Sequence, residues 1–210
     1  LYEEYIASGG SRSADAEAAI AELRGPIATG DLEGDEGASK GLFDKGQAAY
    51  VVGRFMFAAD LFQQAFDLSH RPGLVFSRAQ ALKRAGGHRE EAIAAYNAYL
   101  ANPGSGSRVA EANAAIIEMQ PPEKSGDEET DTKTGHSVFD KGEAAYKAGQ
   151  YMVAADFFEQ AYAVSPRNGL LYSRAQALRM AGGHAALAID LYQRYIDGGG
   201  ERSELAAGFI

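Results

Sequence analysis

The feature that most constrains this chain is an internal repeat of 96 residues. The segment that starts at Leu42 returns at Val138 without a gap, and 33 of the 59 aligned pairs are identical. FDKGQAAY becomes FDKGEAAY, and SRAQALKRAGGH becomes SRAQALRMAGGH. The first residues of the chain align with the end of the same unit through Tyr2, Tyr96 and Tyr192. Such self-similarity is typical of folds that stack one structural unit several times.

A shorter period of 34 residues runs inside each unit. Gly53 and Gly87 are 34 residues apart, as are Phe62 and Tyr96, and the second unit has the same spacing. A small residue four positions before an aromatic residue lies on the same face of a helix and lets a neighbouring helix approach closely. The period therefore predicts pairs of antiparallel helices.

A small-x3-aromatic motif occurs four times, twice in each unit. The four copies are Ala58-x3-Phe62, Ala92-x3-Tyr96, Ala154-x3-Phe158 and Ala188-x3-Tyr192. Gly46 and Gly142 fit the small position of a preceding helix, and Pro166 fits a closing proline. With these residues the chain resembles the tetratricopeptide repeat family. The resemblance implies an all-α fold, an α-solenoid of helical hairpins.

The complete unit is predicted to hold two hairpins and a capping helix. We expect helices at about 41–52, 55–69, 73–85, 89–101 and 107–119, the last ending before Pro121-Pro122. Residues 1–24 are then the C-terminal part of a preceding unit, 42–120 a whole unit, and 138–210 a second unit whose capping helix is cut short. Segments 25–41 and 121–137 hold few large apolar residues and several acids, so they are predicted to be acidic linkers.

Charge and composition exclude several classes of partner. The net charge is −9, which opposes nucleic acid as a partner because its binding needs clustered Lys and Arg. No apolar run is long enough to span a bilayer, so no membrane insertion is expected. The absence of cysteine excludes disulfides and thiolate zinc sites and leaves the redox compartment open.

No catalytic residue, metal site or cofactor is predicted, and the chain is not expected to be an enzyme. His88 and His184 each follow two glycines, and this context indicates turn residues. Ser77 and Ser173 lack both a nucleophile-elbow pattern and a paired base. The glycine-rich turns lack the preceding strand and the Lys-Ser/Thr of a phosphate loop.

The family resemblance implies where a partner would bind, namely the concave surface lined by the first helix of each hairpin. The candidates carried over onto this sequence are Asp44, Gln47, Tyr50, Ser77 and Arg78, with Asp140, Glu143, Tyr146, Ser173 and Arg174 in the second unit. Asp44 and Arg78 occupy the same position in consecutive hairpins, so they are expected to face one another across the groove. A structural ion pair between them is the alternative to a binding role.

Two apolar pairs stand where the family usually has charged residues, at the start of the second helix. They are Met56-Phe57 in the first unit and Met152-Val153 in the second. An apolar pair at such a place indicates a covered surface. The cover is either a partner or the chain itself, through a linker or a neighbouring unit.

The sequence thus predicts a non-catalytic scaffold that binds a peptide or partner helix, with tandem units adding avidity. The near-identity of the units suits a repetitive partner, or a second copy of the chain. Two alternatives stay open. One is a structural array that assembles with itself, and the other is the targeting or spacer region of a larger enzyme or toxin.

Overall fold

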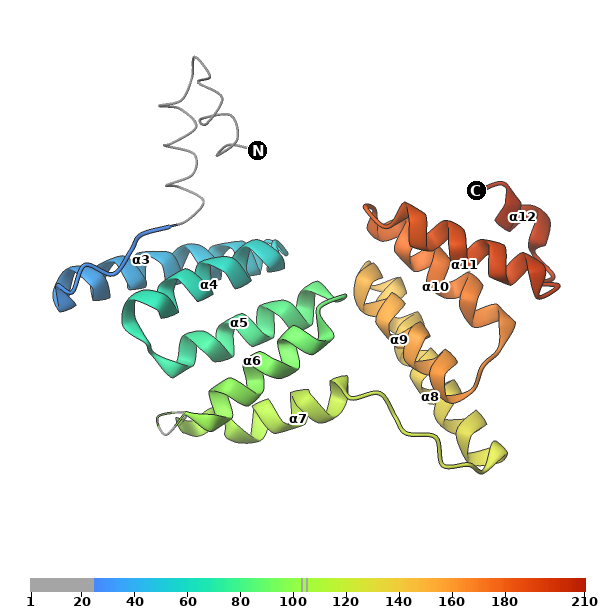
Figure 1. Ribbon diagram of the computed structural model, residues 1–210, viewed down its shortest axis with the longest axis horizontal. Coiled ribbons are helices and arrows are strands. Elements are labelled where there is room, and N and C mark those ends of the chain that lie inside the picture. Colours follow the sequence, from blue (N-terminus) through green and yellow to red (C-terminus); the bar gives the residue numbers. More distant parts are fainter. Residues whose placement is uncertain (1–24, 103, 105) are drawn as a thin grey trace, which may run out of the picture.

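The computed structural model describes residues 25–102, 104 and 106–210, which form an all-helical protein without a strand (Figure 1). The predicted all-α class is confirmed. The expected partial unit at 1–24 lies outside the described residues.

The helices of the first unit are α3 (Leu32–Val51), α4 (Phe55–Ser69), α5 (Pro72–Ala85), α6 (Arg89–Ala101) and α7 (Val109–Met119), with a 3-10 turn at Gly106–Arg108. Those of the second unit are α8 (Glu128–Lys147), α9 (Tyr151–Val164), α10 (Asn168–Ala181), α11 (Ala185–Asp197) and α12 (Ser203–Ala207).

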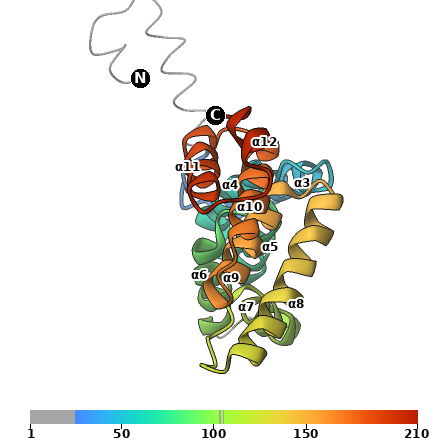
Figure 2. The ribbon, with the colours of Figure 1, turned by 90° about the vertical axis from the view of Figure 1, so that its right-hand side faces the viewer.

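Consecutive helices pack against one another within each unit. The two units, coloured blue to green and yellow to red in Figure 1, meet where α5 contacts α9. Figure 2 views the molecule from the end of the second unit and shows α8 at one edge, beside α9. The architecture is that of a helical repeat.

Glycine lets the first two helices of each unit cross closely. A methyl group on Gly46 would lie 2.7 Å from Cε1 of Phe62, and one on Gly142 would lie 2.7 Å from Cε1 of Phe158. The alanine four residues before each of these aromatic rings, Ala58 in the first unit, is fully buried. The small-x3-aromatic spacing therefore marks helix crossings, because only small side chains leave room for the opposing ring.

Aromatic side chains fill the core of the second hairpin. Phe76 is fully buried, with ring centroids 5.4 Å from Tyr96 and 5.1 Å from Tyr99, both edge-on. Tyr172 stands at the equivalent position of unit 2, 5.1 Å from Tyr195. Edge-on aromatic pairs add about 0.5–1.5 kcal/mol to the free energy gained by burying their area.

A capping helix closes the apolar side of each second hairpin. In α7 the buried residues are Ala112, Ala115, Ile116 and Met119. The short α12 buries Ala206, and Phe209 beyond it lies 5.5 Å from the ring of Tyr192. Both helices therefore cover apolar surface that the second hairpin of their unit would otherwise expose to solvent.

The predicted linkers are wrong over their second halves, because helix α3 begins at Leu32 and α8 at Glu128. Each helix is anchored by a buried aspartate that closes the preceding turn. Asp35 accepts hydrogen bonds from the backbone N–H of Thr29 (3.0 Å) and of Gly30 (3.0 Å). Asp131 accepts from the backbone N–H and the hydroxyl of Ser125, both at 2.8 Å. These bonds hold the pKa of both carboxyls below the usual range.

The connection between the units is therefore only eight residues long, from Gln120 to Asp127. Pro121 and Pro122 restrict its first part. Ser125 and Gly126 belong to the turn that Asp131 closes, and Gly126 adopts a positive φ of 83°. A connection this short and this constrained holds the two units near one another.

No helix in the described part of the chain has the length and apolar content that crossing a bilayer would require.

Candidate functional site: the groove between the units

The predicted binding residues of unit 1 do not converge on one pocket. Asp44 is exposed and pairs with Lys40 one turn earlier (Nζ–Oδ2 2.7 Å), and among the described residues no ion pair joins it to Arg78. Gln47 is exposed as well. The hydroxyl of Ser77 donates to the carbonyl of Gly73 in its own helix (3.0 Å). This set therefore forms no single site in unit 1.

In unit 2 the structure brings three of the predicted residues together. Glu143, Tyr146 and Ser173 line one groove of about 290 Å³ between α8 and α10. Arg174 is directed elsewhere, because its guanidinium pairs with Glu159 of α9 (2.8 Å). Asp140 is exposed and does not line this groove.

The same small groove of unit 2 contains an arginine that sequence reasoning missed. The guanidinium of Arg202 lies 5.6 Å from the centre of the Tyr172 ring. Its counterpart in unit 1, Arg108, lies 3.7 Å from the centre of the Phe76 ring and also binds both oxygens of Glu111. Among the described residues Arg202 has no carboxylate partner. The sequence did contain a signal for this residue, because an arginine precedes the capping helix in both units, Arg108 before α7 and Arg202 before α12.

The two apolar pairs have different surroundings. Met152 and Val153 are half-buried against the turn between α5 and α6, whereas Met56 and Phe57 are exposed. Of the two covers that the sequence left open, a neighbouring unit of the same chain is the one that the structure shows for Met152-Val153.

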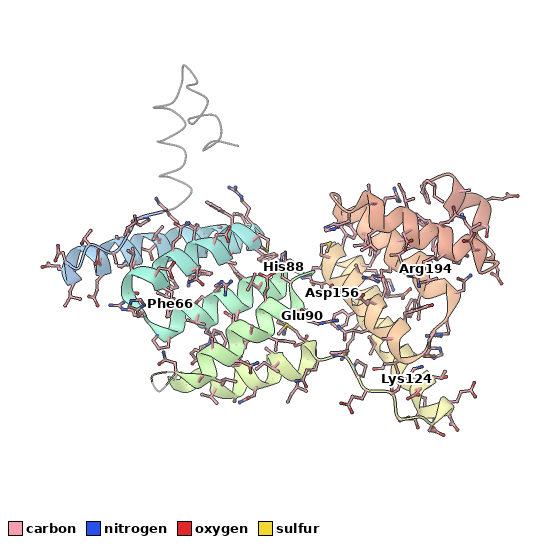
Figure 3. The ribbon with its side chains drawn as sticks, in the orientation of Figure 1. Phe66, His88, Glu90, Lys124, Asp156 and Arg194 are labelled. Atoms are coloured by element: carbon pink, nitrogen blue, oxygen red, sulfur yellow. The ribbon has the colours of Figure 1, made fainter. Side chains whose placement is uncertain are left out.

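The junction of the units is a backbone contact that requires glycine. The backbone N–H of Gly87 donates to Oδ2 of Asp156 (2.7 Å), which lies beside His88 in Figure 3. A methyl group on Gly86 would lie only 2.5 Å from the backbone nitrogen of Val153. Burial raises the pKa of Asp156, and the hydrogen bond from Gly87 opposes that shift. The turn thus rests directly on the first turn of α9.

Docking of the units creates a groove between them. It has two sections, of about 780 and 840 Å³, which share Ala114, Glu118, Lys141 and Phe157. Residues of α3, α5, α6 and α7 form one side, and residues of α8 and α9 form the other. Much of the floor is alanine, at positions 114, 115, 144, 145 and 148. We refer to this surface as the inter-unit groove.

Charged side chains line the rim of the inter-unit groove. Lys83 pairs with Glu118 (2.5 Å), and Glu111 accepts a hydrogen bond from Gln80 (3.0 Å). Among the described residues Arg84 and Lys141 have no carboxylate partner. Lys83 thus compensates the charge of Glu118, and Arg108 that of Glu111. Arg84 and Lys141 keep uncompensated charges, and the guanidinium of Arg84 lies 5.5 Å from the centre of the Phe55 ring.

The sequence did not predict the inter-unit groove, although two of the predicted contact residues, Tyr50 and Val153, line it. Tyr50, placed by the resemblance on the concave surface of unit 1, lines the groove and packs edge-on against Phe55 (centroids 5.2 Å apart). Neither unit contains the groove alone, so no pattern within a single repeat could reveal it.

Over residues 25–102, 104 and 106–210 there is no cluster of three His, Asp or Glu side chains suited to a metal ion. Ser173, like Ser77, donates to a carbonyl of its own helix, that of Gly169 (3.2 Å). His88 contacts the carboxylate of Glu91 (3.0 Å) at the start of α6.

No protein-family model matches the chain, and no curated protein matches it in sequence.

Proposed function

We propose that this protein is a non-catalytic scaffold of tandem tetratricopeptide-like units, and that the inter-unit groove binds an acidic amphipathic segment of a partner protein. The observation that carries the proposal is a continuous groove with an alanine floor and two uncompensated cations, Arg84 and Lys141, at its rim.

The chemistry of the groove matches a peptide or helix with one apolar and one acidic side. Alanines on the floor let the backbone of a ligand approach closely, as small residues do between packed helices. Val153 and Phe157 offer apolar surface to the ligand's apolar side chains. Glutamate or aspartate at the edges of the ligand would pair with Arg84 and Lys141. This is the helix-in-groove mode of recognition.

The smaller groove of unit 2 supports a second position for the same class of ligand. Glu143 is paired with Lys147 (3.0 Å), which leaves Arg202 as the uncompensated charge. Its counterpart in unit 1 is neutralised by Glu111, but the residue equivalent to Glu111 in unit 2 is Leu205. An acidic side chain of a ligand would pair there with the guanidinium above the Tyr172 ring.

The test uses a fluorescein-labelled helical peptide of about four turns, with leucine on one face and glutamate beside it. Its binding is followed by fluorescence anisotropy at low ionic strength. We expect the glutamate peptide to bind more tightly than the same peptide with lysine in place of glutamate. The double variant Arg84→Glu, Lys141→Glu should weaken binding by about tenfold or more, because two exposed attractions of up to about 1 kcal/mol become repulsions.

Two further variants separate the groove from general charge effects. Ala144→Trp should block binding by filling the floor, whereas Lys45→Glu, an exposed cation outside the groove, should leave the affinity within about twofold. Equal affinity for both peptides, or unchanged binding by the double variant and by Ala144→Trp, would refute the proposal.

A further inference from the structure

The junction between the two units is built from two half-sites, and each half-site occurs a second time in the chain. The first half-site is the turn Gly86-Gly87, and the second is the start of α9 with Met152, Val153 and Asp156. They meet through the Gly87–Asp156 hydrogen bond of 2.7 Å and through backbone contact at Gly86.

Among the described residues nothing covers the second copy of the turn. Gly182 and Gly183 have φ values of 76° and 74°, against 71° for both Gly86 and Gly87. The ψ values of Gly86 and Gly182 are 163° and 161°. The two turns therefore share one backbone shape. A methyl group on Gly182 or Gly183 would meet nothing within 4 Å in the part of the chain that the structure describes.

The second copy of the receiving surface is exposed as well. Met56, Phe57 and Asp60 precede Met152, Val153 and Asp156 by 96 residues. Met56 is 39% exposed and Phe57 47%, and Asp60 is exposed as well. Among the described residues no hydrogen bond reaches the carboxylate of Asp60, whereas Asp156 accepts one from Gly87.

The uncovered receiving surface is more apolar than the one that is already docked. Val51 and Val52, beside it at the end of α3, are 81% and 71% exposed. The equivalent residues of unit 2 are Lys147 and Ala148. Val51, Val52, Met56 and Phe57 are exposed apolar side chains at the end of α3 and the start of α4, and we call them the α4 face. The guanidinium of Arg54 lies 4.7 Å from the centre of the Phe57 ring within this face. Large exposed apolar side chains gathered in this way mark an interaction surface.

We propose that the α4 face of one chain receives the Gly182-Gly183 turn of a second copy of the same chain. The N–H of Gly183 donates to the carboxylate of Asp60, as Gly87 does to Asp156, and Met56 and Phe57 cover the turn. The two surfaces are different, so the contact is heterologous and leaves one turn and one α4 face unoccupied in every dimer. Repetition of the contact extends the array by the geometry that joins unit 1 to unit 2.

The expected association is weak and depends on concentration. Inside the chain the eight-residue connection supplies an effective concentration on the order of millimolar, and between chains this help is missing. We therefore expect the average mass to rise above the monomer value of 22.3 kDa at roughly 100 µM and higher, and to persist in high salt because apolar contacts dominate.

Sedimentation equilibrium on the whole chain and two variants tests the proposal. The face variant carries Met56→Glu and Phe57→Glu. The turn variant carries Gly183→Asp, which places a carboxylate opposite Asp60 and uses a residue that tolerates positive φ better than most. Each variant alone should remain at 22.3 kDa. An equimolar mixture should form dimers, because the intact turn of the face variant fits the intact α4 face of the turn variant.

Sedimentation equilibrium of a control variant and of the unaltered chain shows which results would overturn the proposal. Val109→Glu alters an apolar side chain as exposed as Met56, 39%, at the start of α7, and should associate like the unaltered chain. Circular dichroism verifies that each variant keeps its helix content. An unaltered chain that stays monomeric at the highest concentration overturns the proposal. So does a turn variant that still associates alone, since that result means contact between two α4 faces.

Discussion

The chain offers a matched pair of substitutions that isolates the junction from local backbone strain. Gly86→Ala and Gly182→Ala change the same residue in the same sequence context, AGGH. Both glycines adopt a φ near 70–76° with a ψ near 160°, a region essentially restricted to glycine. Alanine at either position should lower the free energy of unfolding of its own unit by about 1–3 kcal/mol.

Only Gly86→Ala should also separate the units. Its methyl group would lie 2.5 Å from the backbone nitrogen of Val153 and 2.7 Å from the carbonyl carbon of Met152, and neither atom can rotate away. Opening the junction breaks the hydrogen bond between Gly87 and the Asp156 carboxylate. A hydrogen bond to a charged group contributes about 1.5–3 kcal/mol, so the ratio of docked to undocked molecules should fall about 10- to 150-fold.

Electron paramagnetic resonance measures this directly, because the chain has no cysteine and two labels can be introduced without background. Lys45→Cys and Gln193→Cys place spin labels on exposed positions, one in each unit. We expect a narrow distance distribution for the unaltered chain and for Gly182→Ala, and a broad one for Gly86→Ala. If Gly86→Ala gives the same narrow distribution as Gly182→Ala, the close backbone contact does not hold the units together.

The remaining predictions concern the cores and the anchoring turns. Gly46→Ala and Gly142→Ala should each lower the melting temperature. Overpacking against the phenylalanine ring 2.7 Å away costs about 1–3 kcal/mol, whereas the gain in helix propensity is only about 1 kcal/mol. A higher melting temperature in scanning calorimetry would contradict this prediction. Phe76→Ala should cost unit 1 about 3–5 kcal/mol and leave the amide spectrum of residues near α11 intact, so loss of both units together would indicate a single cooperative fold. The carboxyls of Asp35 and Asp131 have lowered pKa values in the folded chain, so the stability they add is present above about pH 4 and is lost as the pH falls through those lowered values. Replacing both with asparagine should therefore reduce the loss of helix signal at acidic pH in a circular-dichroism titration. An unchanged loss of signal at acidic pH would refute their role.

The helix boundaries that follow from periodicity agree closely with the structure. Four of the five expected helices of unit 1 begin within two residues of their actual starts, at Phe55, Pro72, Arg89 and Val109. The exception is α3, which begins at Leu32 instead of about residue 41. The first half of α3 is poor in large apolar residues. It is held instead by the hydrogen bonds between Asp35 and the turn at Thr29, and such a polar contact leaves no trace in the spacing of apolar residues.

That anchor had a signal in the sequence. The 96-residue offset continues upstream of Leu42, where Gly30, Asp31 and Asp35 return as Gly126, Asp127 and Asp131. The repeat therefore reaches upstream to the starts of α3 and α8. The acidic composition predicts solvated linkers, whereas two of these acids, Asp35 and Asp131, are buried hydrogen-bond acceptors.

What the sequence determined by itself is the repeating unit: the helix pairs, the small residues where they cross, and the aromatic core, because each follows from side-chain spacing along one helix and its neighbour. What only the tertiary structure decided is how one unit meets the next. Gly86, Gly87 and Asp156 are joined across 69 residues of chain. Their copies Gly182, Gly183 and Asp60 have the same residue types but make no such contact with any residue that the structure describes. The same residue types therefore have different surroundings in the two units, because those surroundings depend on which surface of the folded chain packs against them. The inter-unit groove exists for the same reason, as a product of docking that neither unit encodes alone.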